Sequence, residues 1–235
     1  TTLLSQVDSS IGGKNGINTK SGKNLIGTFY NPNEVLIDTN VLKTLPKREI
    51  KAGYAEIIKH SLIKDYKFFK WLENNYEKLL NLDINILEKA VYKSIMIKLW
   101  YVKRDPKENL INNNSRAMLN FGHTIGHAIE AFYNFSKNLN HGEAISIGMS
   151  TEAIISNRLG FLKDSHLEKI LIHFRNAKLK IYDKNLKKSR IIEFILKDKK
   201  NIDNHVNIVL INKIGNSFFC RNIKINQIKK IIKNI

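Results

Sequence analysis

Apolar residues recur with helical spacing over most of the chain from Pro46 onward. Between residues 46 and 63, Ile50, Ile57 and Leu62 fall roughly on one face of a helix. Gly160 is placed to end the fifth helical segment, and Asp164 or Ser165 to cap the start of the sixth. The pattern therefore predicts a bundle of helices, with five further segments at 65–82, 84–102, 116–133, 142–160 and 164–177.

The first 45 residues have a different pattern. They are rich in Gly, Asn, Ser and Thr, with short apolar runs such as residues 34–38, which predicts loops and short strands. Residues 205–212 form the one late segment with a strand pattern. The expected fold is a mainly α-helical domain at 51–235, attached to the C-terminal remnant of an α/β nucleotide-binding domain at 1–50.

Composition limits the classes of protein to consider. Hydrophobic residues make up 43% of the chain, yet no apolar stretch approaches the ~20 residues of a membrane span. The start of the sequence has no signal-peptide pattern, and Cys220, the only cysteine, cannot form a disulfide within the chain. We therefore expect a cytoplasmic protein, with Cys220 in its core. The net charge of +18 raises the alternative of a nucleic-acid-binding protein. The lysines are spread over the whole chain without a nucleic-acid-binding motif, which argues against that alternative.

Histidines and an acidic residue cluster between residues 119 and 144. His123 and His127 are four residues apart, so on a helix both rings project from one face, and His141 precedes Glu143 at the start of the next helix. Such groups suit Zn²⁺ or a similar ion, but ordinary helix histidines are the equally simple interpretation. For Glu143 we favour a role in complementing the helix dipole.

Glycines accompany these histidines and two lysines. Gly122 and Gly126 inside a helix cost about 1 kcal/mol each, which suggests close backbone packing or the approach of a ligand. Near the start of the chain, Lys14 follows a Gly-Gly pair and Lys23 follows another glycine. Taken alone, each is a weak phosphate-binding signal, and a surface turn is the simpler interpretation.

Four separated motifs together resemble 3-dehydroquinate synthases. They are residues 119–131 (LNFGHTIGHAIEA), 141–149 (HGEAISIGM), 53–60 (GYAEIIKH) and the opening 1–32, in the same order as in that family. The resemblance runs from Thr1 to about Gly160 and is weaker beyond. Related sugar-phosphate cyclases share much of the pattern, so the superfamily is better specified than the substrate.

The resemblance implies one divalent metal, Zn or Co, held by Glu56, His123 and His141, with His127 left for the substrate. Spacing alone would instead suggest that His123 and His127, on one face of a helix, both bind the metal. Apolar residues surround Glu56, and a buried carboxylate without a cation would be costly.

The same resemblance implies substrate and NAD contacts. His127, Lys59, Arg116, Asn120 and Lys98 would be catalytic, and Asp8, Lys14, Asn24, Lys199 and Glu108 would bind substrate. Thr1, Thr2, Lys14, Lys23, Val41, Leu42, Lys43 and Thr44 would contact NAD. The chain departs from the family at Pro106, where an apparent insertion separates Glu108 from Arg116, and at His60 and Ser61, where Tyr-Gly is usual.

The activity implied is that of a lyase in the pathway to chorismate. It converts 3-deoxy-D-arabino-heptulosonate 7-phosphate to 3-dehydroquinate and phosphate by NAD-mediated oxidation, phosphate elimination, re-reduction and aldol closure. A homodimer acting on a small sugar phosphate is implied, with neither nucleic acid nor membrane as partner. The 235 residues lack a glycine-rich pyrophosphate loop. We therefore expect a fragment that is inactive alone and binds NAD weakly.

Overall fold

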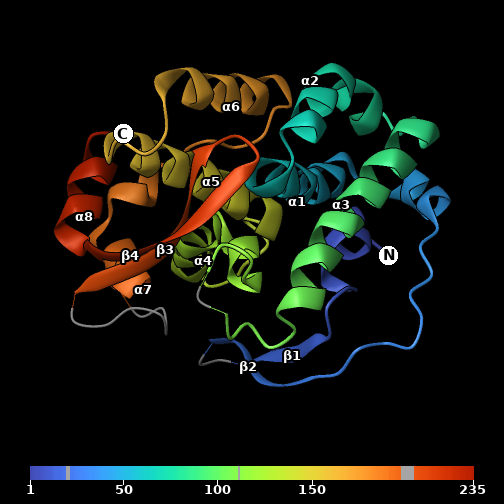
Figure 1. Cartoon of the computed structure of the whole chain (residues 1–235), viewed down its shortest axis with the longest axis horizontal. Coiled ribbons are helices and arrows are strands. Elements are labelled where there is room, and N and C mark those ends of the chain that lie inside the picture. The colour runs from blue at the N-terminus through green and yellow to red at the C-terminus, as the bar shows by residue number, and fades with distance from the viewer. Residues whose placement is uncertain (20–21, 111, 197–203) are drawn as a thin grey trace.

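A computed structural model describes residues 1–19, 22–110, 112–196 and 204–235. Helices form most of it, with two small antiparallel sheets at its edges (Figure 1). None of the helices in these ranges is long and apolar enough to cross a membrane. The helices are α1 (Lys47–Lys64), α2 (Tyr66–Leu80), α3 (Ile84–Arg104), α4 (His123–Phe132), α5 (His141–Arg158), α6 (Asp164–Asn176), α7 (Ser189–Leu196) and α8 (Ile225–Lys233).

Helices α1 and α5 lie at the centre of the molecule. Each is buried over most of its circumference, as expected for helices that other elements surround on all sides. The α5 helix contributes to two apolar clusters. Ile145 and Met149 pack into a cluster with α1, α2, α3 and α6, whereas Ala144 and Ile147 pack into one with α4, α7, α8 and β3 (His205–Lys213). The two clusters therefore share one helix.

Two hairpins flank this helical body. The strand β3 pairs with β4 (Asn216–Lys224), and Gly215 in the turn between them donates its N–H to Leu62 O over 2.7 Å. This bond fastens the hairpin to the end of α1. The other hairpin, β1 (Lys14–Thr19) with β2 (Gly22–Phe29), projects from the lower edge of the molecule in Figure 1.

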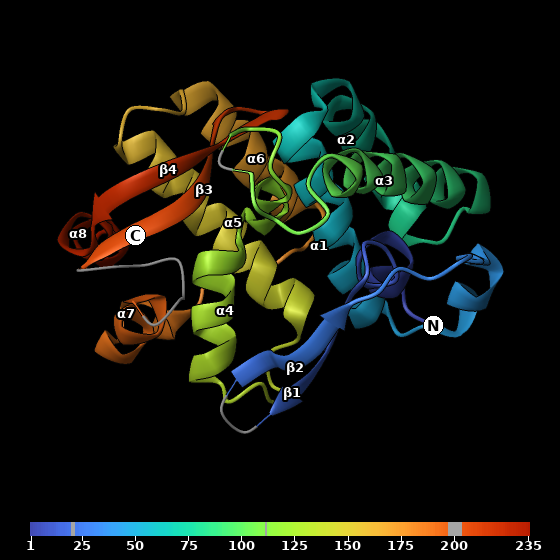
Figure 2. The same ribbon diagram turned by 60° about the horizontal axis from the view of Figure 1, so that its bottom comes forward.

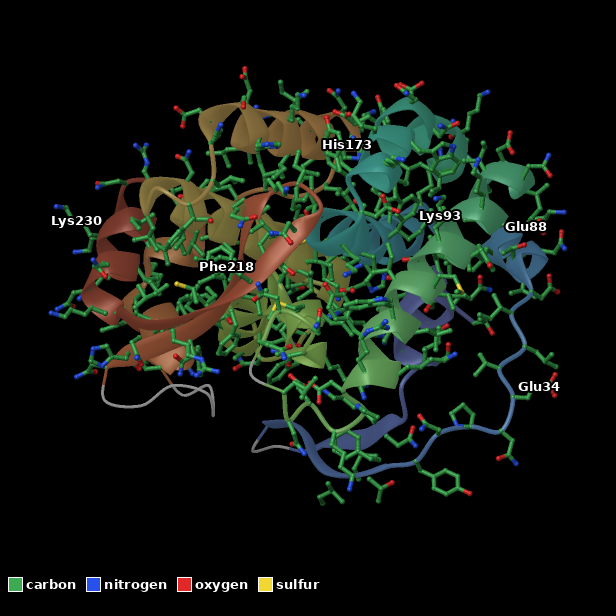
Figure 3. All side chains as sticks on the ribbon, in the orientation of Figure 1. Glu34, Glu88, Lys93, His173, Phe218 and Lys230 are labelled. Atoms are coloured by element: carbon green, nitrogen blue, oxygen red, sulfur yellow. The ribbon has the colours of Figure 1, made fainter. Side chains whose placement is uncertain are left out.

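The β1–β2 hairpin and the segment after it expose large apolar side chains. Ile17 is 63% exposed, Tyr30 71% and Leu36 86%. Charged side chains, by contrast, occur around the whole outline, with Lys230 at one end of the view and Lys93 on α3 (Figure 3).

Glycines let the central helices approach each other closely. A Cβ added to Gly142 would lie 2.2 Å from the Cα of Ala52, where α5 crosses α1, and one added to Gly148 would lie 1.9 Å from Gly122 O, where α5 meets α4. Figure 2 shows α4 and α5 side by side. The close packing expected from Gly122 and Gly126 is confirmed, and with the contact at Gly142 it sets the spacing of the helices that carry the histidines.

The mainly helical fold class is confirmed, but four local expectations were wrong. The segment 116–133 is not one helix, because Phe121 and left-handed Gly122 separate a 3-10 helix at Arg116–Asn120 from α4. Residues 34–38 are not a strand, because none of the described strands lies beside them to supply hydrogen bonds. Helix α6 is preceded by Lys163 without a side-chain cap, and Asp164 is its first residue. The late strand has a partner, β4, whose polar and aromatic residues concealed the strand pattern.

Substituting Gly148 tests the contact between α4 and α5. Gly148→Ala should lower the free energy of unfolding by about 2 kcal/mol or more, because the new methyl group meets a backbone oxygen that cannot move aside. Gly126→Ala is the matched control, since its closest neighbour is the flexible end of Ile145, 2.8 Å away. Urea unfolding measures both. Equal losses in the two variants would contradict this account of the packing.

Candidate metal centre

The Glu56 side chain lies in the middle of α1 and is completely buried. Its Oε2 contacts the ammonium group of Lys59, one turn along the same helix. Its Oε1 faces two histidines from other helices, at 3.9 Å from His123 Nε2 and 3.6 Å from His141 Nε2. A carboxylate, a cation and two imidazoles thus meet inside the molecule.

His123 is held at the first residue of α4. The chain enters this helix through Gly122, whose φ of +82° strains any other residue, and Glu152 of α5 accepts hydrogen bonds from the N–H groups of Gly122 and Ile125. The Nδ1 of His123 lies 3.1 Å from Phe121 O, so this nitrogen donates and Nε2 keeps its lone pair toward Glu56.

His141 begins α5 in a comparable way. Asn140 caps the helix by accepting from the N–H of Glu143, and the Glu143 side chain accepts from the N–H of Asn140 in return. The His141 Nδ1 lies 3.2 Å from Oε1 of buried Glu130, which fixes the ring with Nε2 toward Glu56. Glu143 also pairs with Arg48 at 2.7 Å. The expectation that Glu143 complements the helix start is therefore confirmed.

A third histidine adjoins the pair. The His127 ring is exposed, and its centroid lies 5.2 Å from that of His123 and 6.3 Å from that of His141. Two overlapping sets of possible ligand atoms result, each within 4.8 Å of one another. One is Glu56, His123 and His141, and the other is His127, Glu130 and His141.

The first set fits a divalent ion. Both Glu56 oxygens are buried and accept no hydrogen bond of normal geometry from the described residues. Ligand atoms held at 2.0–2.2 Å by one tetrahedral ion lie about 3.3–3.6 Å apart. The separation of Glu56 Oε1 from His141 Nε2, 3.6 Å, falls in this range, and that from His123 Nε2, 3.9 Å, is slightly longer. The set of His127, Glu130 and His141 fits less well. Glu130 already bonds to Nδ1 of His141, and so it orients the ring whose Nε2 faces Glu56.

The protonation states of Glu56 and His123 suit a metal ligand, whereas His141 must lose a proton to become one. Burial by itself would raise the pKa of Glu56, but Lys59 and His141 hold it well below its usual value. Burial and the charge of Lys59 lower the pKa of His123 well below its usual value. Burial would also lower the pKa of His141, but Glu130 and Glu56 outweigh it and raise that pKa to about 9. A metal binding at neutral pH therefore displaces a proton from His141.

A second pair of opposite charges lies beside this cluster. Lys98 of α3, 5% exposed, donates to the Asp8 side chain over 2.6 Å and to the Asp8 carbonyl. Burial would raise the pKa of Asp8, yet Lys98 lowers it to about 2. Asp8, Glu56 and His60 have ligand-type atoms within 4.8 Å of one another, so the two ion pairs are contiguous. His60 stands at a position where the chain departs from the family that it resembles. It is buried, and its Nδ1 lies 2.5 Å from Ser94 Oγ.

The loop after α3 supplies the remaining polar groups. Asp105 accepts from the N–H groups of Arg116 and Asn109 and from the Ser115 hydroxyl, which folds the loop back on itself. Arg116, 4% exposed, donates to Pro106 O over 2.9 Å. Burial lowers its pKa despite the charges of Glu108 and Asp8 nearby.

Glu108 lies at the site despite the apparent insertion after it. Its carboxylate contacts the ammonium group of Lys14 and accepts from Asn120 Nδ2 over 2.8 Å. The structure thus brings together many of the residues singled out in the sequence, which come from the first 14 residues, from α1, α3, α4 and α5, and from the loop between α3 and α4. They are Asp8, Lys14, Glu56, Lys59, Lys98, Glu108, Arg116, Asn120, His123, His127 and His141.

Other expected site residues lie apart or cannot be placed. Lys199 and the side chains of Lys23 and Asn24 fall outside the described residues. Thr2 accepts a hydrogen bond from Ser5 N, beside exposed Thr1. In the 3-10 helix Thr39–Thr44, Val41, Lys43 and Thr44 are exposed, but the Leu42 side chain is buried in the core and offers a ligand only its backbone.

Sequence reasoning missed three acidic residues that hold the site in shape. Glu130 supports His141, Glu152 supports the start of α4, and Asp105 organises the loop that carries Arg116. Glu130 and Glu152 are acidic residues within otherwise apolar helical segments, a signal that could have revealed them.

Comparison with known proteins gives consistent matches. A relative named 3-dehydroquinate synthase from Pelagibacter ubique is 47% identical over 225 residues, which are 93% of this chain and 60% of the relative. One from Dictyoglomus turgidum, with the same name, is 43% identical and covers 99% of this chain and 64% of its own length. The chain thus spans less than two thirds of these relatives.

Solved structures agree on the fold. The structure of 2-deoxy-scyllo-inosose synthase complexed with carbaglucose-6-phosphate, NAD⁺ and Co²⁺ is 26% identical, with a TM-score of 0.81 over 100% of this chain and 65% of that one. That of 2-epi-5-epi-valiolone synthase from Streptomyces hygroscopicus, with NAD⁺ and Zn²⁺ bound, is 24% identical, with a TM-score of 0.85 over 99% of this chain and 64% of that one.

Family profiles account for most of the sequence. The profile described as 3-dehydroquinate synthase N-terminal matches residues 1–52, and the one described as 3-dehydroquinate synthase C-terminal matches residues 53–201. Two profiles that meet end to end in this order leave little room for coincidence, and the chain belongs to the 3-dehydroquinate synthase family.

Proposed function

We propose that this chain supplies the metal- and substrate-binding part of an enzyme that converts 3-deoxy-D-arabino-heptulosonate 7-phosphate to 3-dehydroquinate and phosphate. The observation that carries the proposal is the buried Glu56, with its Oε1 facing His123 and His141, beside a cluster of cationic side chains. The names of relatives 41–47% identical to the chain support this substrate. The activity is that of the whole protein, since the chain spans only part of those relatives.

The proposed metal ligands are Glu56 Oε1, His123 Nε2 and His141 Nε2. Zn²⁺ or Co²⁺ is the expected ion, as in the two solved neighbours, and when bound it would act as a Lewis acid toward a substrate oxygen. Three protein ligands leave a coordination position for that oxygen. Lys59 keeps the Glu56 carboxylate ionised, and Glu130 keeps His141 oriented.

Cations next to the ligands would bind the acidic groups of the substrate. Arg116 and Lys98 are both nearly buried, which strengthens their attraction to a carboxylate or phosphate. Asp8 holds Lys98 in place, and Asp105 holds the backbone of Arg116. Asn120 and Lys14, both bonded to Glu108, would contact the substrate from the loop side.

His127 is proposed to hydrogen-bond the substrate without binding the metal. Its ring is exposed beside His123, one turn along α4 from the ligand set. Its exposed ring is accessible to a ligand, and imidazole is the side chain that most often exchanges a proton with a reacting group.

NAD would supply the redox chemistry by accepting and returning a hydride. Contacts from this chain would come from Thr1, Thr2, Lys14, Lys23 and residues 41–44, with Leu42 acting through its backbone. A second candidate is another sugar-phosphate cyclase reaction, favoured by the names of the solved neighbours.

Metal binding tests the ligand set. The chain should bind one Zn²⁺ or Co²⁺. His123→Ala or Glu56→Gln should weaken metal binding by more than about 100-fold, because mutating a residue that only supports a ligand already lowers metal affinity about 10–100-fold. Competition with a chromophoric chelator measures the affinity for the metal, and the Co²⁺ absorption spectrum reports its binding. His166→Ala, which removes a histidine of α6 remote from the cluster, is the control and should leave affinity unchanged. Wild-type affinity in both ligand variants would disprove the assignment.

Replacing His127 separates the two overlapping ligand sets. His127→Ala should keep full metal content, because the ring is not among the proposed ligands. In an active protein it should lower kcat by about 100-fold, typical of a lost proton-transfer group. Metal analysis and steady-state kinetics on the same preparation decide the point. Loss of the metal would assign the site to His127, Glu130 and His141 instead.

Activity is best tested with the chain joined to the N-terminal part of the Pelagibacter ubique relative. This protein should release one phosphate per heptulosonate phosphate consumed, form 3-dehydroquinate and lose at least about 99% of its rate after metal chelation. Phosphate release and product chromatography measure both. A protein that keeps its metal but turns over only a hexose 6-phosphate would support the alternative cyclase reaction.

A further inference from the structure

A second polar cavity lies outside the metal centre. It has a volume of about 290 Å³ and is enclosed by α1, the first turns of α5 and residues 178–180. The Ser150 hydroxyl of α5 donates to Ile181 O over 2.6 Å, which ties that last segment to the helix. None of the proposed metal, substrate or NAD residues lines this cavity.

The cavity carries cations that have no partner within the described part of the chain. Arg48 and Lys180 on its rim are both paired with Glu143, at 2.7 and 3.4 Å. Lys51 and Lys178 also line it, yet neither forms an ion pair or side-chain hydrogen bond with the residues that the structure describes. Half-buried Lys51 and exposed Lys178 thus present two positive charges that no described acidic side chain opposes.

A buried hydroxyl adds an independent sign of a ligand. Ser146 lines the cavity and is fully buried, but its Oγ has no hydrogen-bond partner among the described residues. Leaving a buried polar group unpaired costs about 1–3 kcal/mol, so such groups usually have a partner. A bound molecule that accepts a hydrogen bond would remove this cost.

The start of α5 favours a negative charge at the same place. Gly142, the second residue of the helix, lines the cavity without a side chain to cover the backbone. Amide groups in a first helical turn have no acceptor within the helix, and the helix dipole is positive there. Asn140 caps the N–H of Glu143, one residue further along.

We propose that this cavity binds the phosphate group of a small molecule. Its two negative charges match Lys51 and Lys178, and its oxygens can accept from Ser146 Oγ and from the first turn of α5. The cavity is larger than phosphate alone, and a neighbouring cavity of about 310 Å³ shares both lysines and is lined by Tyr76 and Leu80. The expected ligand is therefore a phosphate ester whose organic part extends toward Tyr76.

This site lies directly behind the metal centre. Gly142 follows the proposed ligand His141, and Ala52 on the cavity wall lies one helical turn before Glu56. The site is nonetheless distinct from the substrate cations, because Lys98 and Arg116 do not line it. Its existence does not depend on the reaction proposed above.

Titration of the chain with inorganic phosphate, against chloride at equal ionic strength, tests the proposal. Phosphate should shift the backbone amide resonances of Gly142 and Ser146, and acetate should do so much more weakly. The double variant Lys51→Gln, Lys178→Gln should raise the Kd reported by these amides by about 10-fold or more, as expected for lost charge-assisted bonds. Lys187→Gln, an exposed lysine elsewhere, should leave it unchanged.

Ser146→Ala separates a ligand site from a merely basic surface. It should raise the same Kd about 5-fold, while leaving the ligand-free protein at least as stable as before, since the buried hydroxyl has no partner to lose. Phosphate shifts no larger than those with chloride, or a Kd that neither variant changes, would overturn the proposal. Shifts confined to Arg116 and Asn120, on the substrate side, would overturn it as well.

Discussion

Burial of the Glu56 carboxylate is the constraint on which the centre of this molecule depends. An ionised carboxylate inside a helical bundle is stable only if cations or hydrogen-bond donors surround it. Lys59 meets one oxygen, and the nitrogens of His123 and His141 lie near the other. Each of these groups is itself buried or supported, so the helices that deliver them have little freedom to move apart.

That requirement accounts for the unusual closeness of the helices. The histidines begin α4 and α5, and both must reach a carboxylate in the middle of α1. Gly142 lets α5 cross α1 at Ala52, and Gly148 lets α5 lie against the backbone of Gly122. Glu130 and Glu152 then fix the ring of one histidine and the backbone before the other. The glycines and buried acids thus support the same three side chains.

The sequence allowed helices α1 to α6 and the face of α4 that carries His123 and His127 to be predicted, because both follow from local spacing, whereas α7 and α8 were missed. Spacing alone could not identify which histidine faces Glu56, since that depends on a helix more than 60 residues earlier in the chain. Resemblance to a family supplied Glu56. The supports Glu130, Glu152 and Asp105 were missed because their partners are backbone groups or rings brought together only by folding. The strand β4 was missed for a similar reason, since its stability comes from pairing with β3.

Helix α5 belongs to both apolar clusters, and this has a consequence for how the molecule comes apart. Loosening either cluster exposes one side of the same helix and weakens its hold on the other cluster. The helical body is therefore expected to open as one cooperative unit, with the exposed β1–β2 hairpin fraying independently at far lower cost. Substitutions in α7 or α8 are distant in sequence from the histidines, but they would change the packing of α5, the helix that begins at His141, and so weaken metal binding.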